Sequence, residues 1–185
     1  MELENGRNRK TMNQKISGLL NFEIKIAWWP DRFIKRFFKK KKTKMNKTLV
    51  EIALAEYGAK EILGSQHNMD IVTYAKYSGF DWVNDDETPW CSIFLNYVAL
   101  KSKMERTKKA NARSWLDVGI EVNHPETSDI VIFKRGNSDW QGHVGIFINQ
   151  EDDFIRVLGG NQGNEVNIST YNAKKVLGFR RLRKA

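Results

Sequence analysis

The sequence contains one cysteine, three prolines and no long apolar run. A single cysteine excludes an internal disulfide, so oxidation cannot stabilise the fold. A transmembrane helix needs about 18 or more consecutive apolar residues, and the sequence has no such run. The polar start, MELENGRNRKTMNQK, lacks the apolar core of a secretory signal peptide. With 41% hydrophobic residues in a chain of 185, we expect a packed core rather than a membrane protein.

The net charge of +9 is distributed unevenly along the chain. Residues 1–47 contain 14 Lys or Arg and 4 Asp or Glu, a net charge of +10. Residues 48–185 contain 17 and 18, a net charge of −1. We therefore divide the chain into a basic N-terminal arm, residues 1–47, and one domain, residues 48–185. Contact with an anionic membrane or with nucleic acid is expected from the arm alone.

The arm lacks the pattern of a globular domain. Residues 1–15 are polar without an apolar period, which predicts disorder. Residues 31–38, DRFIKRFF, place aromatic side chains between basic ones and predict a short amphipathic helix. The run KKKKTK at 39–44 marks a boundary. A solvated tail, or a translation start at Met45 that gives the bare domain, would also explain the arm.

From Thr48 onward the pattern is that of an α+β domain. Apolar residues at helical spacing predict a helix ending near Gly58, a second from Ile71 to near Gly79, and a third containing Cys91. A short fourth helix is expected over 111–118. The β-rich segments between turn residues predict strands at 129–134, 143–149, 153–158, 166–170 and 176–181. Helices followed by a run of antiparallel strands are typical of the α+β class.

Cys91 lies where the start of a helix would activate a thiol. Thr88 is a good N-cap and Pro89 fits the first helical position, so Cys91 falls in the first turn. The partial positive charge of a helix N-terminus stabilises a thiolate over a thiol. The backbone N–H of Cys91 is the expected donor to an oxyanion. The acidic residues before the helix are expected to favour its positive end; they are Asp85, Asp86 and Glu87.

His143 and Asn161 complete a set of residues typical of a papain-like cysteine hydrolase. His143 opens a predicted strand directly after Gly142, and Asn161 follows two glycines at the end of the next strand. If these strands are adjacent, the amide of Asn161 can accept from the imidazole Nδ1–H and fix its tautomer. A cysteine, a histidine and an asparagine in this order match the nucleophile, base and orienting residue of such enzymes.

Each of these residues alone has a common structural explanation. A lone cysteine is more often a small buried apolar residue, a histidine at a strand start is usually structural, and Gly-Gly-Asn is usually a turn. Their combination favours catalysis. Trp90 and Trp140 are candidates for a substrate groove, whereas core packing is at least as good an explanation for Trp82 and Trp115. The chain has no CxxC or HExxH motif, so no metal site is expected.

Several separated motifs resemble a known family over about residues 48–183. They are TPWCSIFLNYV, ARSWLDVG, SDIVIFKR, GHVGIFI, VLGGNQGNEVNISTY and VLGFRR. Together they are similar to phage- and bacteria-encoded peptidoglycan hydrolases of the CHAP and NlpC type, which are cysteine amidases and peptidases. The resemblance implies a papain-like fold, in which a helix with the cysteine packs on an antiparallel sheet with the histidine.

The resemblance also implies roles for individual residues. Cys91 would be the nucleophile, His143 the base and Asn161 the orienting residue, with Gln162 and Trp90 beside the site. Ser92 follows the cysteine where a small residue such as alanine is expected. The implied substrate is the peptide part of bacterial peptidoglycan, cut at an amide bond, and no cofactor is implied. Cleavage of the muramoyl–alanine linkage and of the stem peptide both stay open.

Other hypotheses remain at this stage. A non-catalytic cell-wall binding module on the same fold would carry the same motifs. The absence of a signal peptide predicts synthesis in the cytoplasm and action on the wall after release by a holin or a secretion system. Lysis by a phage, remodelling of the producer's wall and attack on a competitor are not separated by the sequence. We expect a monomer.

Overall fold

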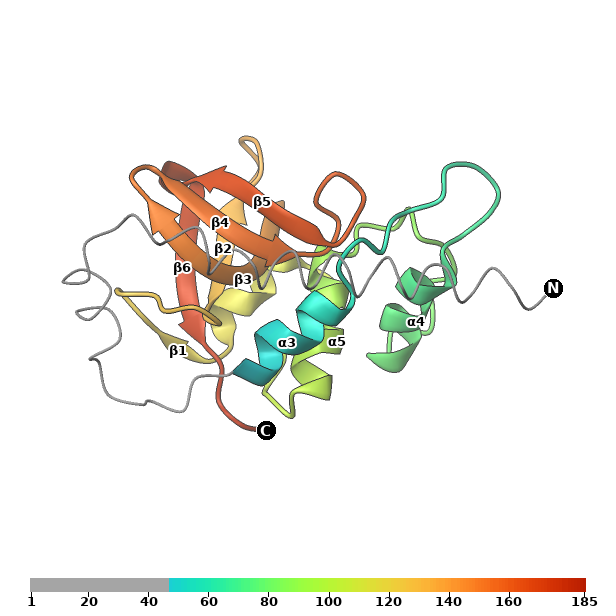
Figure 1. Ribbon diagram of the computed structural model, residues 1–185, viewed down its shortest axis with the longest axis horizontal. Coiled ribbons are helices and arrows are strands. Elements are labelled where there is room, and N and C mark those ends of the chain that lie inside the picture. The colour runs from blue at the N-terminus through green and yellow to red at the C-terminus, as the bar shows by residue number, and fades with distance from the viewer. Residues whose placement is uncertain (1–46) are drawn as a thin grey trace, which may run out of the picture. The chain divides into compact units, whose positions relative to one another are not determined.

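The structure is a computed structural model that describes residues 47–185 (Figure 1). The predictions for the N-terminal arm fall, apart from Lys47, outside the described residues. Three helices come first in the domain and strands come last, as expected. The helices are α3 (Lys47–Ala55), α4 (Met69–Tyr77) and α5 (Cys91–Lys101), followed by the short 3-10 helix η2 (Ala112–Asp117). None of the described helices is long and apolar enough to cross a membrane.

Six antiparallel strands form one sheet in the order β1-β6-β2-β3-β4-β5. Their bounds are β1 Ile120–Glu121, β2 Ile130–Lys134, β3 Gly142–Glu151, β4 Phe154–Gly159, β5 Asn167–Asn172 and β6 Val176–Arg181. The α+β prediction is therefore confirmed, and the five predicted strands correspond to β2 through β6. β1 and the 3-10 helix η3 (Ala173–Lys175) were not predicted, because elements this short show no periodicity.

The helices pack on one face of the sheet. Figure 1 shows α3 and α5 beside one another along the sheet, with α4 farther out. Every residue of α5 from Cys91 to Ala99 is buried, so this helix is surrounded by the protein on all sides. Its partners on the sheet are the apolar residues Ile130, Ile132, Val144, Ile146 and Leu158. The packing expected of a papain-like domain, with the cysteine helix against the antiparallel sheet, is thus present.

The opposite face of the sheet carries a second apolar cluster. Its buried members are Val131, Phe133, Phe147, Ile155 and Val157, with Tyr171 and Phe179 at its margin. Side chains alternate between the two faces of a strand. His143 pairs with Phe133 across β2 and β3, so the predicted base projects on this second face, away from the apolar partners of α5.

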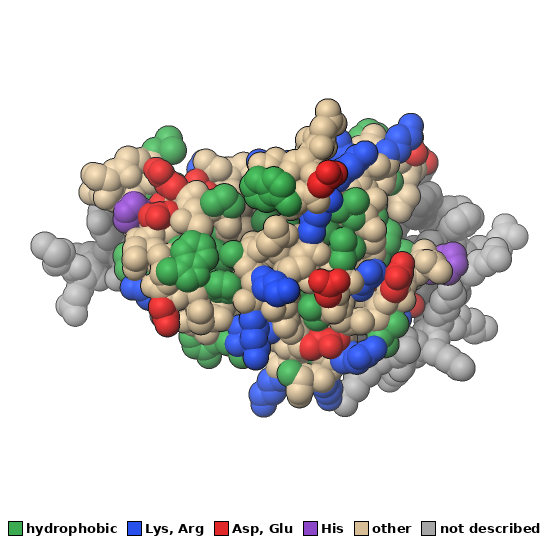
Figure 2. Space-filling model, turned by 180° about the vertical axis from the view of Figure 1, so that it is seen from behind, with side chains coloured by type: hydrophobic (Ala, Val, Ile, Leu, Met, Phe, Trp, Pro, Cys, Tyr) green, Lys and Arg blue, Asp and Glu red, His purple; other side chains and the backbone are tan. Residues whose placement is uncertain are grey.

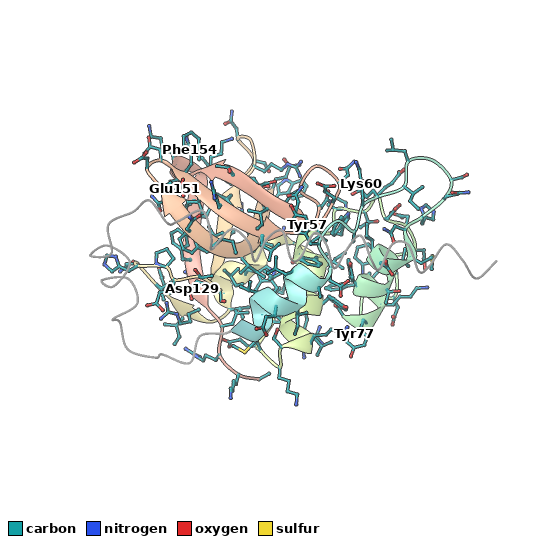
Figure 3. The ribbon with its side chains drawn as sticks, viewed as in Figure 1. Tyr57, Lys60, Tyr77, Asp129, Glu151 and Phe154 are labelled. Atoms are coloured by element: carbon teal, nitrogen blue, oxygen red, sulfur yellow. The ribbon has the colours of Figure 1, made fainter. Side chains whose placement is uncertain are left out.

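A segment after α3 holds the loop that follows β4. Gly58 N–H donates to the Val166 carbonyl at 2.8 Å, and Val166 N–H donates to the Ala59 carbonyl at 2.8 Å. Lys60, labelled in Figure 3, forms an isolated bridge with Glu165. This loop contains Asn161 and Gln162, so the segment that follows α3 helps to position residues about 100 positions later in the sequence.

The surface of the domain carries charges of both signs. On the face seen in Figure 2, Lys and Arg side chains are interspersed with Asp and Glu. This agrees with the near-neutral charge of residues 48–185.

Trp90 is a core residue and not part of a groove. Its side chain is 1% exposed, and its Nε1–H donates to Glu61 Oε1 at 2.7 Å. The indole lies directly against Gly160: a Cβ on that glycine would be 2.4 Å from Trp90 Cζ3 and 2.7 Å from Phe94 Cβ. The prediction that Trp90 lines a substrate groove is therefore corrected. Proximity to Cys91 in sequence did not reveal that the ring faces the opposite way, into the core.

We expect Gly160→Ala to destabilise the domain by about 1–3 kcal/mol, because a methyl group would overlap a rigid indole ring. Gly159→Ala is the matched control, since a Cβ there meets its nearest atom at 3.4 Å, an ordinary contact. Urea unfolding of both variants measures the difference. Equal midpoints would show that the Trp90 ring can move aside.

Candidate active site

Cys91 is the first residue of α5, and Trp90 is the N-cap without a side-chain capping bond. Thr88 and Pro89 therefore precede the helix, which corrects the predicted cap. Thr88 instead donates to Asp85 Oδ1 through its backbone N–H at 2.7 Å and its hydroxyl at 2.9 Å. The predicted placement of Cys91 in the first turn is correct, although a different residue caps the helix.

The acidic residues before α5 are engaged in turns rather than aimed at the helix end. Asp86 is fully buried and accepts the N–H of Ile62 at 2.8 Å and of Asn68 at 2.9 Å. His67 Nδ1 lies 3.1 Å from the other oxygen of Asp86. Asp85 receives the bonds from Thr88. These two carboxylates thus fix the segment between α3 and α5, and their expected role at the helix dipole is replaced by a structural one.

Ser92 anchors the start of α5 to the segment before η2. It is fully buried; its hydroxyl donates to the Lys109 carbonyl at 2.7 Å and accepts from Trp115 Nε1–H at 2.9 Å. An alanine here would leave the buried indole N–H without this acceptor. The hydroxyl therefore explains why this chain has serine where alanine was expected. It also confirms that Trp115 is a core residue, whereas Trp82 is 63% exposed.

The sulfur of Cys91 lies at the backbone of β3. Arg135 N–H donates to the Gln141 carbonyl at 3.4 Å, so residues 135 and 141 form a hydrogen-bonded pair of the antiparallel ladder. Such pairs alternate with pairs that are not hydrogen-bonded. Residues 133 and 143 are therefore hydrogen-bonded to one another, and residues 132 and 144 are not. The N–H of Val144 therefore points away from β2. It is this N–H that acts on the Cys91 sulfur and favours the thiolate. Cys91 is thus placed next to the peptide bond between His143 and Val144.

Burial dominates the electrostatics of the thiol. Cys91 is 8% exposed, and its desolvation raises the pKa of the thiol. The N–H groups of Val144 and Ser92 and the charge of Arg135 act in the opposite direction without reversing it. The helix N-terminus was expected to yield a thiolate, but the loss of water outweighs it. In the absence of substrate, the structure favours the neutral thiol.

The amide that meets His143 belongs to Gln162. His143 Nε2 lies 3.1 Å from Gln162 Oε1. The Gln162 amide nitrogen is surrounded by acceptors, the carbonyl oxygens of Asn167 at 2.6 Å and Val157 at 3.1 Å. This network assigns the oxygen of the amide to the imidazole, so Nε2 carries the proton and Nδ1 the lone pair. The sequence predicted an amide from this segment, but on the other ring nitrogen.

Asn161 serves the turn rather than the imidazole. Its φ is +57°, a left-handed conformation that asparagine adopts more readily than most residues. Within residues 47–185, its side chain makes no hydrogen bond. The turn directs the next residue inward, and Gln162 is 3% exposed. The structure therefore brings His143 together with Gln162, the neighbour that the resemblance placed beside the site, and not with Asn161.

Tyr171 stacks on His143 on the same face of the sheet. The two rings are 5.0 Å apart at 21°, and Tyr171 also stacks on Phe133 at 4.9 Å and 26°. Burial, followed by the charge of Cys91, raises the pKa of Tyr171 to about 12, so the phenol is neutral. Sequence reasoning missed Tyr171 because β5 is not adjacent to β3. Its ring reaches the imidazole across β4.

His143 is held in its neutral form. It is 7% exposed, and burial lowers its pKa to about 4, although the bond to Gln162 raises it and Arg135 lowers it further. A neutral imidazole with an unprotonated Nδ1 is the form that a general base requires. The described residues contain no group of three His, Cys, Asp or Glu side chains that could hold a metal ion. This form of the ring suits His143 to accept a proton.

Trp140, the other predicted groove residue, lies on the hairpin that joins β2 to β3. It is 67% exposed. Asn111 Nδ2 donates to its carbonyl at 3.3 Å, and Arg113 Nε donates to the Gln141 carbonyl at 2.8 Å. The hairpin is thus fastened to the segment that begins η2, and an exposed indole stands two residues before Gly142. Contact of this indole with a substrate stays a prediction.

The low pKa of His143 predicts a pH-dependent stability. Unfolded histidine has a pKa near 6.5. As pH falls below about 6.5, the unfolded state takes up a proton that the native state refuses until about pH 4, so stability decreases across this window, by up to about 3 kcal/mol. Asp85 and Asp86, with pKa values lowered from 3.8, lose their contributions only at lower pH.

Urea unfolding at several pH values measures this effect, with His143→Gln as the control. The control should lose the slope between pH 6.5 and 4. An NMR titration of the His143 ring in the wild type gives its pKa directly and does not depend on how the variant folds. A ring that titrates near 6.5 would contradict the assignment of a neutral buried base.

The chain is similar to a known protein family and to solved structures. Residues 83–161 match the CHAP domain family, a segment that contains Cys91, His143 and Asn161. A comparison with curated proteins finds no match.

Two solved structures are similar to this chain. One is a protein described as similar to lipoprotein, of the NLP/P60 family, from Staphylococcus aureus subsp. aureus Mu50, with 16% identity and a TM-score of 0.43. The alignment covers 77% of this chain and 43% of that one, so this chain spans less than half of its length. The other is the peptidoglycan hydrolase RipB from Mycobacterium tuberculosis, with 12% identity and a TM-score of 0.43, covering 97% of this chain and 85% of that one. The resemblance predicted from the sequence motifs is confirmed by the family match, in which residues 83–161 are similar to the CHAP domain family.

Proposed function

We propose that this protein is a cell-wall hydrolase that cleaves an amide bond of peptidoglycan with Cys91 as nucleophile and His143 as general base. The observation that carries the proposal is the bond between His143 Nε2 and Gln162 Oε1, which leaves Nδ1 free to accept the thiol proton. The CHAP match supports the class of reaction. The peptidoglycan substrate comes from the resemblance of the sequence motifs.

The chemistry follows from two neutral groups. As the Cys91 sulfur attacks the substrate carbonyl carbon, its proton passes to Nδ1 of His143. The N–H of Cys91 at the start of α5 is the proposed donor to the oxyanion. The imidazolium then gives its proton to the amide nitrogen, the C–N bond breaks, and the amine leaves a thioester on Cys91. Water attacks the thioester while His143 accepts its proton, which releases a carboxylate and restores the thiol.

Gln162 assists by holding one tautomer. Its oxygen accepts from Nε2–H in both the neutral and the charged imidazole, so it stabilises the positive charge that forms in the first step. Tyr171 limits the rotation of the ring by stacking on it. Both residues act through His143 and are positioning residues rather than catalytic ones. Cys91 and His143 do not determine which bond is cleaved, the muramoyl–alanine amide or one in the stem peptide. Other groups of the protein make that choice.

One observation favours the alternative, a cell-wall binding module without activity. Cys91 is buried and its thiol pKa is raised, as in a cysteine that only packs. A catalytic cysteine in this setting must lose its proton within the complex with substrate rather than before it. Action on the wall after release by a holin or a secretion system remains part of the proposal for either function.

Digestion of purified peptidoglycan by the wild type and by Cys91→Ala tests the proposal. We expect new fragments from the wild type alone, and their masses identify the bond. Cys91→Ala should lose at least about a thousandfold in rate while keeping its melting temperature, because alanine fits the buried position. Binding of both proteins to peptidoglycan without fragments from either would favour the wall-binding module.

Substitutions of Gln162 and of its neighbour Asn161 test which of the two amides orients His143. Gln162→Ala should lower kcat about a hundredfold with little change in KM. The substitution leaves the imidazole of His143 free to change its tautomer but removes no contact with the substrate. Asn161→Gly, which removes the amide but suits the left-handed turn, should stay within about threefold of the wild type. Melting temperatures separate a loss of fold from a loss of positioning. The reverse ranking would assign the orienting role to Asn161.

A further inference from the structure

Arg135 continues the hairpin two pairs beyond His143. It directly follows β2, and its N–H bonds to the Gln141 carbonyl, so the ladder that pairs Phe133 with His143 extends to Arg135 and Gln141. By the two-residue period of a strand, Arg135 projects on the same face as His143. Lys134, between them, projects on the other face. Both side chains are exposed, yet only Arg135 stands on the side of the predicted base.

The guanidinium of Arg135 is not neutralised within the described domain. The ion pairs among residues 47–185 do not include it, although Arg156, Arg180 and Arg181 all have acidic partners. Arg113, whose guanidinium also lies at this hairpin, is engaged with the carbonyls of Gln141 and Ser138. Arg135 therefore leaves an unpaired planar cation beside a site that is otherwise built from neutral groups.

The charge of Arg135 reaches three separate groups of the site. It lowers the pKa of Cys91, of His143 and of Tyr171. These residues come from α5, β3 and β5, so the charge of Arg135 acts on groups of three different elements, although burial has the larger effect on each. The strand geometry independently places Arg135 on the face of His143.

We propose that Arg135 is a specificity-determining residue that binds a carboxylate of the substrate close to the scissile amide. The inference rests on the proposed function and names its substrate class: peptides with a free carboxylate beside the cleaved bond, in preference to the same peptides with that group amidated. A guanidinium pairs with a carboxylate through two parallel hydrogen bonds, which fixes orientation as well as charge. Such a contact would align the amide carbonyl with Cys91.

A purely electrostatic role of Arg135 would change the kinetics differently from a carboxylate-binding role. If Arg135 acted only by stabilising the Cys91 thiolate, its removal would lower kcat for every substrate alike. A carboxylate-binding role instead makes the effect depend on the substrate and appear mainly in KM. Two peptides that differ in a single group therefore separate the two roles.

The test uses stem peptides in pairs, with one α-carboxylate free in one member and amidated in the other. The full-length wild type should cleave the carboxylate peptide with a kcat/KM about tenfold to a hundredfold higher, as expected for a charged hydrogen-bonded contact. Arg135→Gln should remove this preference by slowing cleavage of the carboxylate peptide alone. Lys134→Gln, the matched control on the opposite face, should leave both rates within about twofold of the wild type.

Two results would overturn the inference. An equal loss on both peptides in Arg135→Gln would assign it a purely electrostatic role, and no loss on either would remove it from the site. Binding of the two peptides to Cys91→Ala, measured by calorimetry with and without Arg135→Gln, keeps the inference separate from catalysis. If the wild type cleaves nothing, the proposed function fails, and the same calorimetric preference or its absence still decides the role of Arg135.

Discussion

The burial of α5 from Cys91 to Ala99 is the constraint on which the rest of the site depends. Nine consecutive residues from Cys91 are buried, so the helix has no free face along which it could slide or tilt. Ser92 holds the first turn of α5 against the segment before η2. Trp90, the residue directly before the helix, packs against Gly160. The position of the Cys91 sulfur is therefore set by the core of the domain. The same burial removes water from the thiol and raises its pKa.

Most of the fold was predictable because its signals are local. The strands from β2 to β6 lie in β-rich segments separated by turn residues, and each is found within a few residues of its predicted range. The helices were also located, but the start of α5 was not. Thr88 has the chemistry of an N-cap, yet Asp85, three residues earlier, accepts its hydroxyl and its N–H. Cap preference is a statistical tendency, and a competing local turn overrides it here.

The sequence predicted which segments of the chain form the candidate site, but not which side chains meet there. Order along the chain placed a cysteine, a histidine and an amide on the right three elements. Choosing between Asn161 and Gln162 required the direction of the backbone in a turn, which depends on a positive φ that the sequence does not specify. Tyr171 required knowledge that its ring reaches His143 across β4, and Trp90 required knowledge that its ring packs against Gly160. These are long-range properties, and no local pattern encodes them.

Burial opposes charge on Cys91 and on His143, yet the proposed reaction needs a thiolate and an imidazolium. The transfer of one proton between them creates no net charge, and each product already has a partner: Val144 N–H for the sulfur and Gln162 Oε1 for Nε2–H. Arg135 favours the thiolate but disfavours the imidazolium. A substrate carboxylate paired with Arg135 would cancel both effects and make His143 a stronger base. On this reasoning a substrate with a carboxylate at Arg135 would raise the basicity of His143 above that of the protein alone.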